Sequence, residues 1–170
     1  MRRPAIQLLC ALTILCSASV WAQTDSVIAW KDYAPKNEWW VNAGMLSYHV
    51  DRHAGYNNAN FGLGLEYRFA STASVTAGRF YNSDRDYSNY AGIYWQPLAI
   101  GPVQAGVVAG GFNGYPTTNH GGWFAAVLPA LTVEGKRLGA NVFLIPTIGD
   151  RVHGAISLQL KLKVFDQNTW

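Results

Sequence analysis

Residues 121–146 read GGWFAAVLPALTVEGKRLGANVFLIP, two long apolar segments joined by a short charged one at residues 134–137. Beyond the charged segment the side chains alternate, with Leu138, Ala140, Val142 and Leu144 on one face and Gly139, Asn141, Phe143 and Ile145 on the other. A period of two is the pattern of a β-strand. The stretch therefore predicts two neighbouring antiparallel strands joined by a tight turn.

Each of these two strands carries a proline, Pro129 and Pro146. Proline has no N–H to donate to a strand partner, so it occurs at strand ends, sheet edges and bulges. A barrel in lipid has no free edge, because every backbone group must be paired. The two prolines therefore either end their strands near the rims or open a gap in the hydrogen-bonded wall.

The alternation recurs along the chain, most clearly where Phe61, Leu63, Leu65, Tyr67 and Phe69 alternate with Gly62, Gly64, Glu66 and Arg68. Further strands are expected at residues 38–50, 74–82, 89–96 and 103–110 and after residue 154. Charged residues are only 14% of the chain, well below the share in typical soluble domains, and aromatics are also 14%. These features predict an eight-stranded antiparallel outer-membrane β-barrel over residues 38–165, with both chain ends in the periplasm.

The first 22 residues have the pattern of a signal peptide, with Arg2 and Arg3, an apolar run and a small-x-small cleavage site before Gln23. Export to the outer membrane follows from this interpretation. Both cysteines, Cys10 and Cys16, would be removed, so we expect no disulfide, no metal site and no cofactor. Residues 23–37 would form a periplasmic lead-in, either a short amphipathic helix or an unstructured segment, and residues 166–170 a tail.

The charge balance of the mature chain excludes one class of partner. Removing Arg2 and Arg3 lowers the 13 Lys and Arg to 11, against 10 Asp and Glu, so the formal charge is +1. Nucleic-acid-binding proteins carry a basic footprint. We therefore expect no nucleic-acid partner, and we expect a monomer.

An eight-stranded barrel has an interior that is either filled by side chains or wide enough for one small ligand. Inward glycines on several strands favour room inside, although they equally suit barrel curvature. Glu66, Arg68 and Arg79 are expected to point inward on neighbouring strands, where burial requires that they pair. We interpret these three residues as a structural ion network.

One pair of residues has catalytic potential. His49 ends the first strand at the outer rim, and Asn82-Ser83 ends the third strand at the same rim. Histidine beside serine is the minimum needed to activate a hydroxyl group. The alternative is a polar rim that binds only water or lipid head groups.

Three features of the sequence belong together: the segments Phe80-Tyr81-Asn82-Ser83, Tyr90-Ala91-Gly92 and Trp95-Gln96-Pro97-Leu98; the segments Tyr56-Asn57 and Phe61-Gly62-Leu63-Gly64; and the spacing of Pro129 and Pro146. In all three the chain resembles the lipid A palmitoyltransferase (PagP) family. The first feature is similar to the family's catalytic third strand and the strand after it, the second to its first loop and second strand, and the third to its lateral lipid gate. The family has an aspartate where this chain has Asn82. The family's first-strand histidine aligns with Trp40, whereas the position at the rim favours His49.

The resemblance implies a phospholipid:lipid A acyltransferase, with a phospholipid as acyl donor and lipid A as acceptor. His49 would be the general base, Ser83 its polar partner and Asn82 the orienting residue, with Pro129 and Pro146 as the lipid gate. Two alternatives remain open: a lipid A deacylase, and a non-enzymatic structural or adhesive barrel. On the resemblance, Asn82→Asp should preserve or raise activity.

Overall fold

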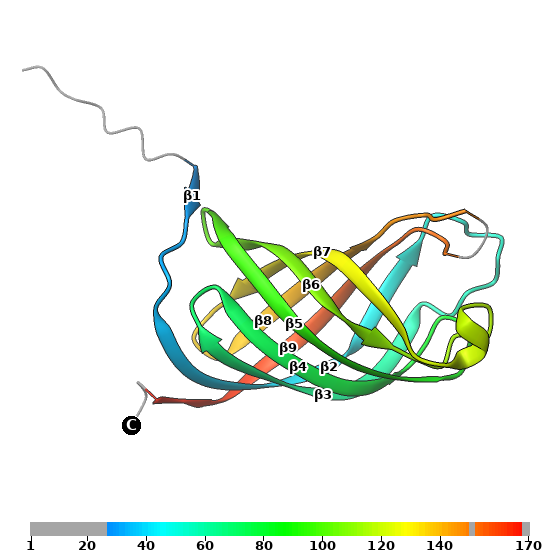
Figure 1. Cartoon of the computed structure of the whole chain (residues 1–170), viewed down its shortest axis with the longest axis horizontal. Helices are drawn as coiled ribbons and strands as arrows, with labels where there is room; N and C mark the ends of the chain where they lie inside the picture. The colour runs from blue at the N-terminus through cyan, green and yellow to red at the C-terminus, as the bar shows by residue number, and fades with distance from the viewer. Residues whose placement is uncertain (1–26, 150–151, 168–170) are drawn as a thin grey trace, which may run out of the picture.

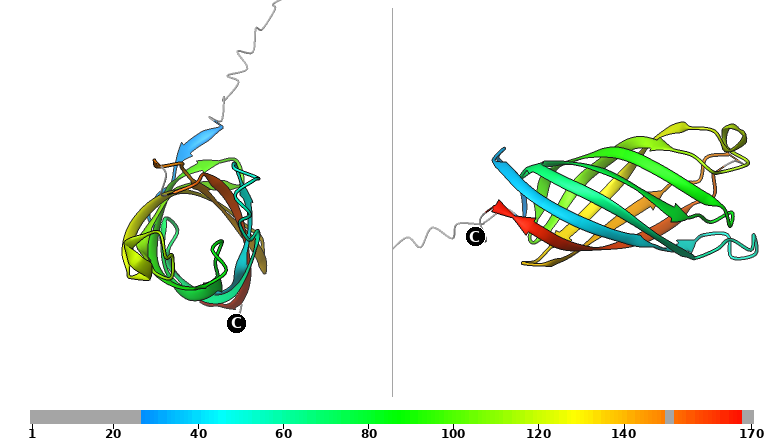
Figure 2. Two further views of the ribbon diagram at one scale, coloured as in Figure 1. Left: turned by 90° about the vertical axis from the view of Figure 1, so that its right-hand side faces the viewer. Right: turned by 90° about the horizontal axis from the view of Figure 1, so that it is seen from below.

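The structure is a closed antiparallel barrel of eight strands. It is a computed structural model that describes residues 27–149 and 152–167, so the signal peptide predicted for residues 1–22 lies outside the described residues. The strands are β2 (Pro35–His49), β3 (Ala59–Ala70), β4 (Ala73–Tyr81), β5 (Tyr87–Ile100), β6 (Val103–Phe112), β7 (Phe124–Glu134), β8 (Leu138–Ile145) and β9 (Ala155–Asp166). Each pairs with the next, and β2 pairs with β9 to close the ring (Figures 1 and 2). The predicted fold class is confirmed.

A ninth strand, β1 (Ile28–Trp30), lies outside the ring, where a short helix was one expectation. It pairs with Leu98–Ile100 of β5, beyond the point where Trp95 pairs with Ala73 of β4. The end of β5 therefore has a free edge, which β1 covers. The indole of Trp30 packs edge-on against Trp95, with 6.3 Å between ring centroids. The helix interpretation is wrong for the described part of this segment.

Within the described ranges, no helix is long and apolar enough to cross a membrane.

The two ends of the barrel differ. Short turns at residues 71–72, 101–102 and 135–137 lie at one end, where β1 and the end of β9 are also found (Figure 1). Longer loops, which include residues 50–58, 82–86 and 113–123, lie at the other end. The third of these contains η1 (Asn119–Gly121). Short turns and longer loops therefore alternate along the barrel.

The barrel exterior is apolar. Exposed large apolar side chains on its strands include Leu46, Phe61, Leu63, Leu65, Val75, Ile93, Val127, Leu144, Ile156, Leu158 and Leu160. Large aromatic side chains are also exposed towards the strand ends, among them Trp39, Tyr48 and Tyr87. An apolar outer band with aromatics at its margins is typical of barrels that sit in lipid.

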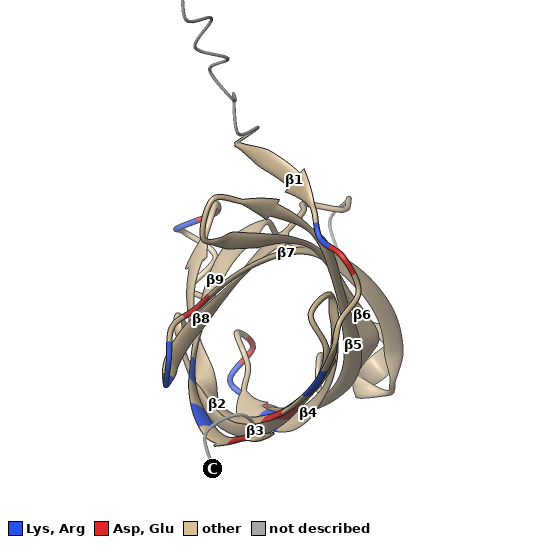
Figure 3. Cartoon of the chain, turned by 90° about the vertical axis from the view of Figure 1, so that its left-hand side faces the viewer, with Lys and Arg blue, Asp and Glu red and all other residues tan. Residues whose placement is uncertain are grey.

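The half of the interior nearest the short turns is closed by four charged side chains, which we call the charged plug: Glu66, Arg68, Glu134 and Lys161. Lys161 Nζ lies 3.0 Å from Glu66 Oε1 and 2.7 Å from Glu134 Oε1, and Arg68 Nη2 lies 2.7 Å from the same Glu134 oxygen. Two cations and two anions balance, which is what burial of charges requires. Figure 3 looks at the barrel from this end and colours the charged positions on its strands.

The prediction that Glu66 and Arg68 belong to an inward-facing ion network is therefore confirmed. The same prediction for Arg79 is wrong. Arg79 is exposed, and its guanidinium lies 4.3 Å from the centroid of the Tyr87 ring. Ser74, Thr76 and Phe80 are the buried residues of β4, so Arg79 falls on the outward face. The partners that the sequence prediction did not include are Lys161 of β9 and Glu134 of β7.

The other half of the interior is apolar. Tyr94, Val108, Ala130 and Phe143 form a buried cluster, against which Met45, Leu128 and Ile145 pack. These side chains come from five neighbouring or facing strands and lie between the charged plug and the long loops. The interior thus has a charged end and a largely apolar chamber.

The wall is incomplete between β7 and β8. Their pairing stops at Ala130 and Phe143, although β7 continues outward and remains paired with β6 as far as Phe124. We call the unpaired part, residues 124–129 and 144–146, the β7–β8 seam. Pro129 lies within β7, and Pro146 follows the last residue of β8. Pro129 therefore lies beside an interruption of the wall, and Pro146 follows the strand end on its other side, so each interpretation of the prolines describes one of them.

Candidate active site

His49 and Ser83 meet at the rim, as their strand positions predicted. His49 is the last residue of β2, and Ser83 follows the end of β4 by two residues. His49 Nε2 lies 3.0 Å from Ser83 Oγ, which is hydrogen-bonding distance. The imidazole is buried although it lies at the end of a strand. Burial holds the ring in one orientation and limits competition from water.

The opposite ring nitrogen of His49 has a partner that sequence analysis did not identify. His49 Nδ1 lies 2.9 Å from Asn58 Oδ1, and an amide oxygen can only accept a hydrogen bond. Nδ1 therefore carries the proton, and the lone pair of Nε2 faces Ser83. Serine, histidine and asparagine in this order are an arrangement that can activate a hydroxyl group. The polar loop that contains Asn57 and Asn58 was the only sequence signal.

Asn82 makes different contacts from those that the resemblance implied for an orienting residue. Its amide nitrogen donates to Ser88 Oγ at 3.0 Å and to the carbonyl oxygen of Gly114 at 2.6 Å. Its amide oxygen accepts hydrogen bonds from the backbone N–H groups of Asp84 and Asp86. The buried Asn82 side chain thus ties the 82–86 turn to the neighbouring loop, and it positions Ser83 through the backbone rather than contacting His49.

Asn82→Asp is therefore expected to lower stability and activity, contrary to what the resemblance implied. A carboxylate cannot donate to Gly114 or Ser88, and its charge would face the Gly114 carbonyl oxygen. An unsatisfied buried group of this kind costs about 1–3 kcal/mol. The measurement is the urea midpoint of unfolding in detergent micelles, with Asn89→Asp as the control, because Asn89 is exposed. An Asn82→Asp midpoint equal to that of the unmodified protein would contradict this role.

Tyr56 and two further ionisable residues surround His49. The Tyr56 ring lies 4.8 Å from the ring centroid of His49 on one side and 5.3 Å from that of His153 on the other. Burial raises the pKa of the Asp84 carboxyl above its usual value, and the nearby His49 and His153 partly offset this rise. Tyr56 fixes the plane of the imidazole, so that Nε2 stays directed at Ser83.

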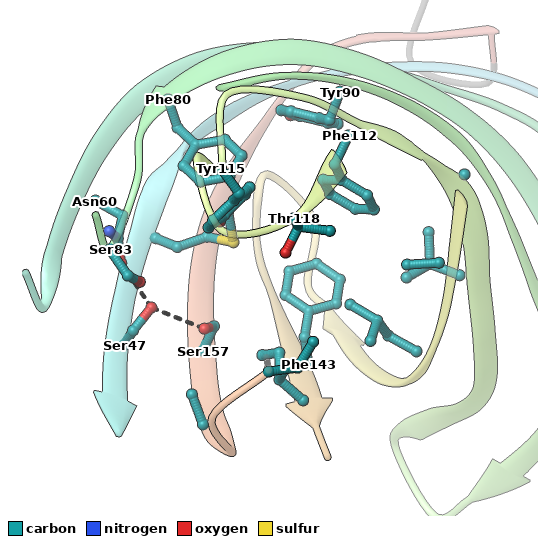
Figure 4. Close-up of a pocket in the computed structure, with 18 of the residues that line it drawn as sticks. Ser47, Asn60, Phe80, Ser83, Tyr90, Phe112, Tyr115, Thr118, Phe143 and Ser157 are labelled. Atoms are coloured by element: carbon teal, nitrogen blue, oxygen red, sulfur yellow. Dashed lines mark hydrogen bonds between the residues drawn. The ribbon is translucent and has the colours of Figure 1, made fainter. Parts of the chain in front are cut away.

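A cavity of about 550 Å³ opens beside this group and extends into the apolar half of the barrel (Figure 4). His49 and Ser83 line it near the loops, and Tyr94, Val108 and Phe143 line it at its deep end. Leu128, Ile145 and Pro146 are also in its wall, so the cavity reaches the β7–β8 seam. The site therefore combines a serine hydroxyl hydrogen-bonded to a histidine, a largely apolar chamber and an interruption of the wall beside it.

Among the described residues, no group of three or more His, Cys, Asp or Glu side chains could hold a metal ion.

No protein-family model matches the chain, and no curated protein matches it. The chemistry of the site consequently has to be argued from its own geometry.

Proposed function

We propose that this protein is an outer-membrane acyltransferase that moves an acyl chain from a phospholipid to lipid A. The observation that carries the proposal is the Ser83–His49–Asn58 arrangement at the mouth of an apolar cavity. The apolar exterior supports a place in the membrane. The resemblance to the lipid A palmitoyltransferase family in the segments around Ser83 and in the proline pair supports the choice of lipids.

The reaction uses the tautomer that Asn58 sets. His49 Nε2 takes the proton of Ser83 Oγ as this oxygen attacks the carbonyl carbon of the donor ester. The proton then passes to the departing alcohol oxygen, and the acyl group remains on Ser83. His49 next takes a proton from a hydroxyl of the acceptor, whose oxygen attacks the acyl-serine and regenerates Ser83. A well-placed base contributes about 10²–10⁴-fold to such a step.

The β7–β8 seam gives the acyl chain a lateral path into the cavity. A lipid in the surrounding membrane has its tail at the level of the barrel wall, whereas the paired wall has no opening for it. At the seam, the strands lack pairing and the cavity lining includes Leu128 and Ile145. An acyl chain can therefore enter sideways while its ester remains near the rim at Ser83.

Mass spectrometry of lipid A from cells with and without the expressed gene tests the function. A gain of one acyl chain supports transfer. A loss of one chain supports the deacylase alternative, in which water replaces the acceptor at the same residues. Unchanged lipid A in cells with folded protein in the outer membrane would contradict both and leave a structural or adhesive barrel.

A reversible covalent bridge between β7 and β8 across the seam is expected to stop acyl transfer. The register that ends at Ala130 and Phe143 would next place Pro129 opposite Leu144 and Val127 opposite Pro146. Val127→Cys with Leu144→Cys, bridged outside the wall by a disulfide-containing bis-maleimide, holds the two strands together. Transfer should fall by more than about tenfold on bridging, because the lipid path closes, and return when a reductant cleaves the bridge.

The same treatment at a paired part of the wall is the control. Leu65→Cys with Ala77→Cys places both cysteines on register partners of β3 and β4, where the wall is already closed. Bridging this pair should leave transfer unchanged. Equal transfer before and after bridging at the seam would show that lipids enter by another route.

A further inference from the structure

A second, smaller hollow of about 280 Å³ lies beside the active site. His49 and Tyr56 line both this hollow and the apolar chamber, so they form the partition between the two spaces. The remaining lining comes from the end of β2 and from the loop that follows it: Tyr48, Asp51, Arg52 and Asn58. Each of these side chains carries a polar group, in contrast to the largely apolar lining of the chamber.

The hollow lies on the side of His49 that does not face the serine. Asn58 is part of its lining, and the Asn58 Oδ1 atom lies 2.9 Å from His49 Nδ1 and keeps the proton there. The lone pair of Nε2 faces Ser83, which lines the chamber. A group in the hollow can therefore bind next to the catalytic pair without exchanging a proton with the base.

Arg52 is held over an aromatic ring but lacks an ionic partner. Its guanidinium carbon lies 4.5 Å from the centroid of the exposed Tyr48 ring. Among the described residues, no carboxylate lies within ion-pairing distance of this guanidinium. Stacking holds the plane of the guanidinium, and the N–H groups at its edge remain available as donors.

Asp51 and Asn58 add an acceptor and a further donor. Asp51 Oδ1 accepts the backbone N–H of His53 at 2.9 Å, which fixes the carboxylate and leaves its second oxygen as an acceptor. Asn58 uses its Oδ1 for His49, so its amide nitrogen remains a donor. Because the hollow contains one cation and one anion, a bare phosphate would meet Asp51 and a metal ion would meet Arg52.

A neutral ring with several hydroxyl groups fits this set of side chains. Each hydroxyl both donates and accepts, so neighbouring hydroxyls can pair with the Asp51 carboxylate and with the Arg52 guanidinium. The rings of Tyr48 and Tyr56 add flat apolar surface for the C–H groups of such a ring. Pockets for drug-sized ligands have volumes of about 300–1,000 Å³, so a hollow of about 280 Å³ suits a single sugar ring.

We propose that the hollow is the subsite for a sugar ring of the acceptor glycolipid, whose hydroxyl groups bind Asp51, Arg52 and Asn58. The inference rests on the proposed function and names the part of lipid A that the protein recognises. Binding of the sugar on one side of the His49–Tyr56 partition brings the acceptor beside the acyl chain, which occupies the chamber on the other side.

The test measures the donor and acceptor steps separately, with the full-length protein folded in detergent micelles. Release of lysophospholipid from phosphatidylethanolamine reports the donor step, and the KM for lipid A reports the acceptor. Arg52→Met should raise this KM about threefold to tenfold, the effect of one lost hydrogen bond, without raising the KM for the phospholipid. Asp51→Asn should act similarly, because it keeps an acceptor for the His53 N–H but replaces the second carboxylate oxygen with a donor.

Arg79→Met is the matched control. The Arg79 guanidinium also lies over an exposed tyrosine, 4.3 Å from the centroid of the Tyr87 ring, but Arg79 is on the outward face of β4 and not in the lining of the hollow. This variant should leave the KM for lipid A unchanged. An equal rise for Arg52→Met and Arg79→Met would show a general attraction of cations for anionic lipid and would overturn the sugar subsite.

A soluble competitor identifies the ligand chemistry. A glucosamine disaccharide without phosphates or acyl chains should inhibit transfer competitively with lipid A, and Arg52→Met should weaken this inhibition. Inhibition by inorganic phosphate in place of the disaccharide would show an anion site and overturn the assignment. So would a disaccharide that inhibits the two proteins equally or inhibits neither.

Failure of the inference and failure of the proposed function look different. An unchanged KM for lipid A in both Arg52→Met and Asp51→Asn, with transfer that depends on Ser83, overturns the sugar subsite and leaves acyl transfer intact. If no lysophospholipid is released and lipid A is unchanged, the proposed function is overturned. Calorimetry with the disaccharide then decides the hollow separately, since binding that Arg52→Met weakens supports the subsite and the absence of such binding overturns it.

Discussion

His49→Ala is expected to lower acyl transfer by about 10²–10⁴-fold, the contribution of a well-placed general base. His49 Nε2 is 3.0 Å from Ser83 Oγ, and alanine leaves nothing to take the Ser83 proton. Ser83→Ala should lower transfer to a similar level, because the two residues act as one unit. The measurement is lipid A mass spectrometry with each variant, together with the slower gel migration of the heat-denatured barrel as a check on folding.

Variants of His153 and Asn58 distinguish the role of His49 as the base from the roles of its neighbours. His153→Ala removes the other histidine that packs on Tyr56 and should retain most activity. Asn58→Asp keeps an acceptor for the Nδ1 proton of His49 and should be more active than Asn58→Leu, which has none. Full transfer by His49→Ala would contradict the assignment and direct the search for the base to His53 or His153.

Lys161→Met is expected to lower the free energy of unfolding by about 3–5 kcal/mol, the usual cost of removing one partner of a buried ion pair. Lys161 Nζ contacts Glu66 and Glu134 at 3.0 and 2.7 Å and is fully buried. Without it, Arg68 alone faces two carboxylates, and the charged plug carries an uncompensated negative charge. Urea unfolding in detergent micelles, followed by tryptophan fluorescence, measures the change.

Lys163→Met is the matched control on the same face of β9. Lys163 pairs with Asp166 at 2.9 Å and with Glu38 at 3.4 Å, but it retains some solvent exposure. We expect a cost of about 1 kcal/mol or less for it. Adding Glu134→Gln to Lys161→Met should recover part of the loss, because it restores neutrality. Equal costs for the two lysine variants would show that the plug is not held by its charge balance.

Much of the barrel was accessible from sequence because several strands alternate between an apolar and a more polar face. Asn141 and Phe143 were assigned to one face of β8 from alternation alone, and both are buried inside. Arg79 was assigned to the wrong face because β4 has small residues on both faces, which give no clear period. The strand β1 was missed because it pairs with the otherwise unpaired end of β5, about 70 residues further along the chain. Its own three residues carry no pattern that indicates this pairing.

The candidate site, too, could be predicted only in part from the sequence. The meeting of His49 and Ser83 followed from the direction of their strands, since both strands end at the same rim. Asn58 was missed because it lies in a loop whose path no periodicity describes. Asn82 was given a role by its place beside Ser83, whereas its bond to Gly114 depends on a loop 32 residues away in sequence.

The charged plug also determines what the barrel would do to the permeability of a membrane that contains it. The chamber above it opens to the long loops and to the seam, but an ion travelling further would have to pass between Arg68, Lys161 and their carboxylates, which contact one another at 2.7–3.4 Å. These contacts place two buried cations and two buried anions in the path of the ion. Planar bilayers that contain the protein should consequently show no single-channel conductance, so the apolar chamber would not make the barrel a leak.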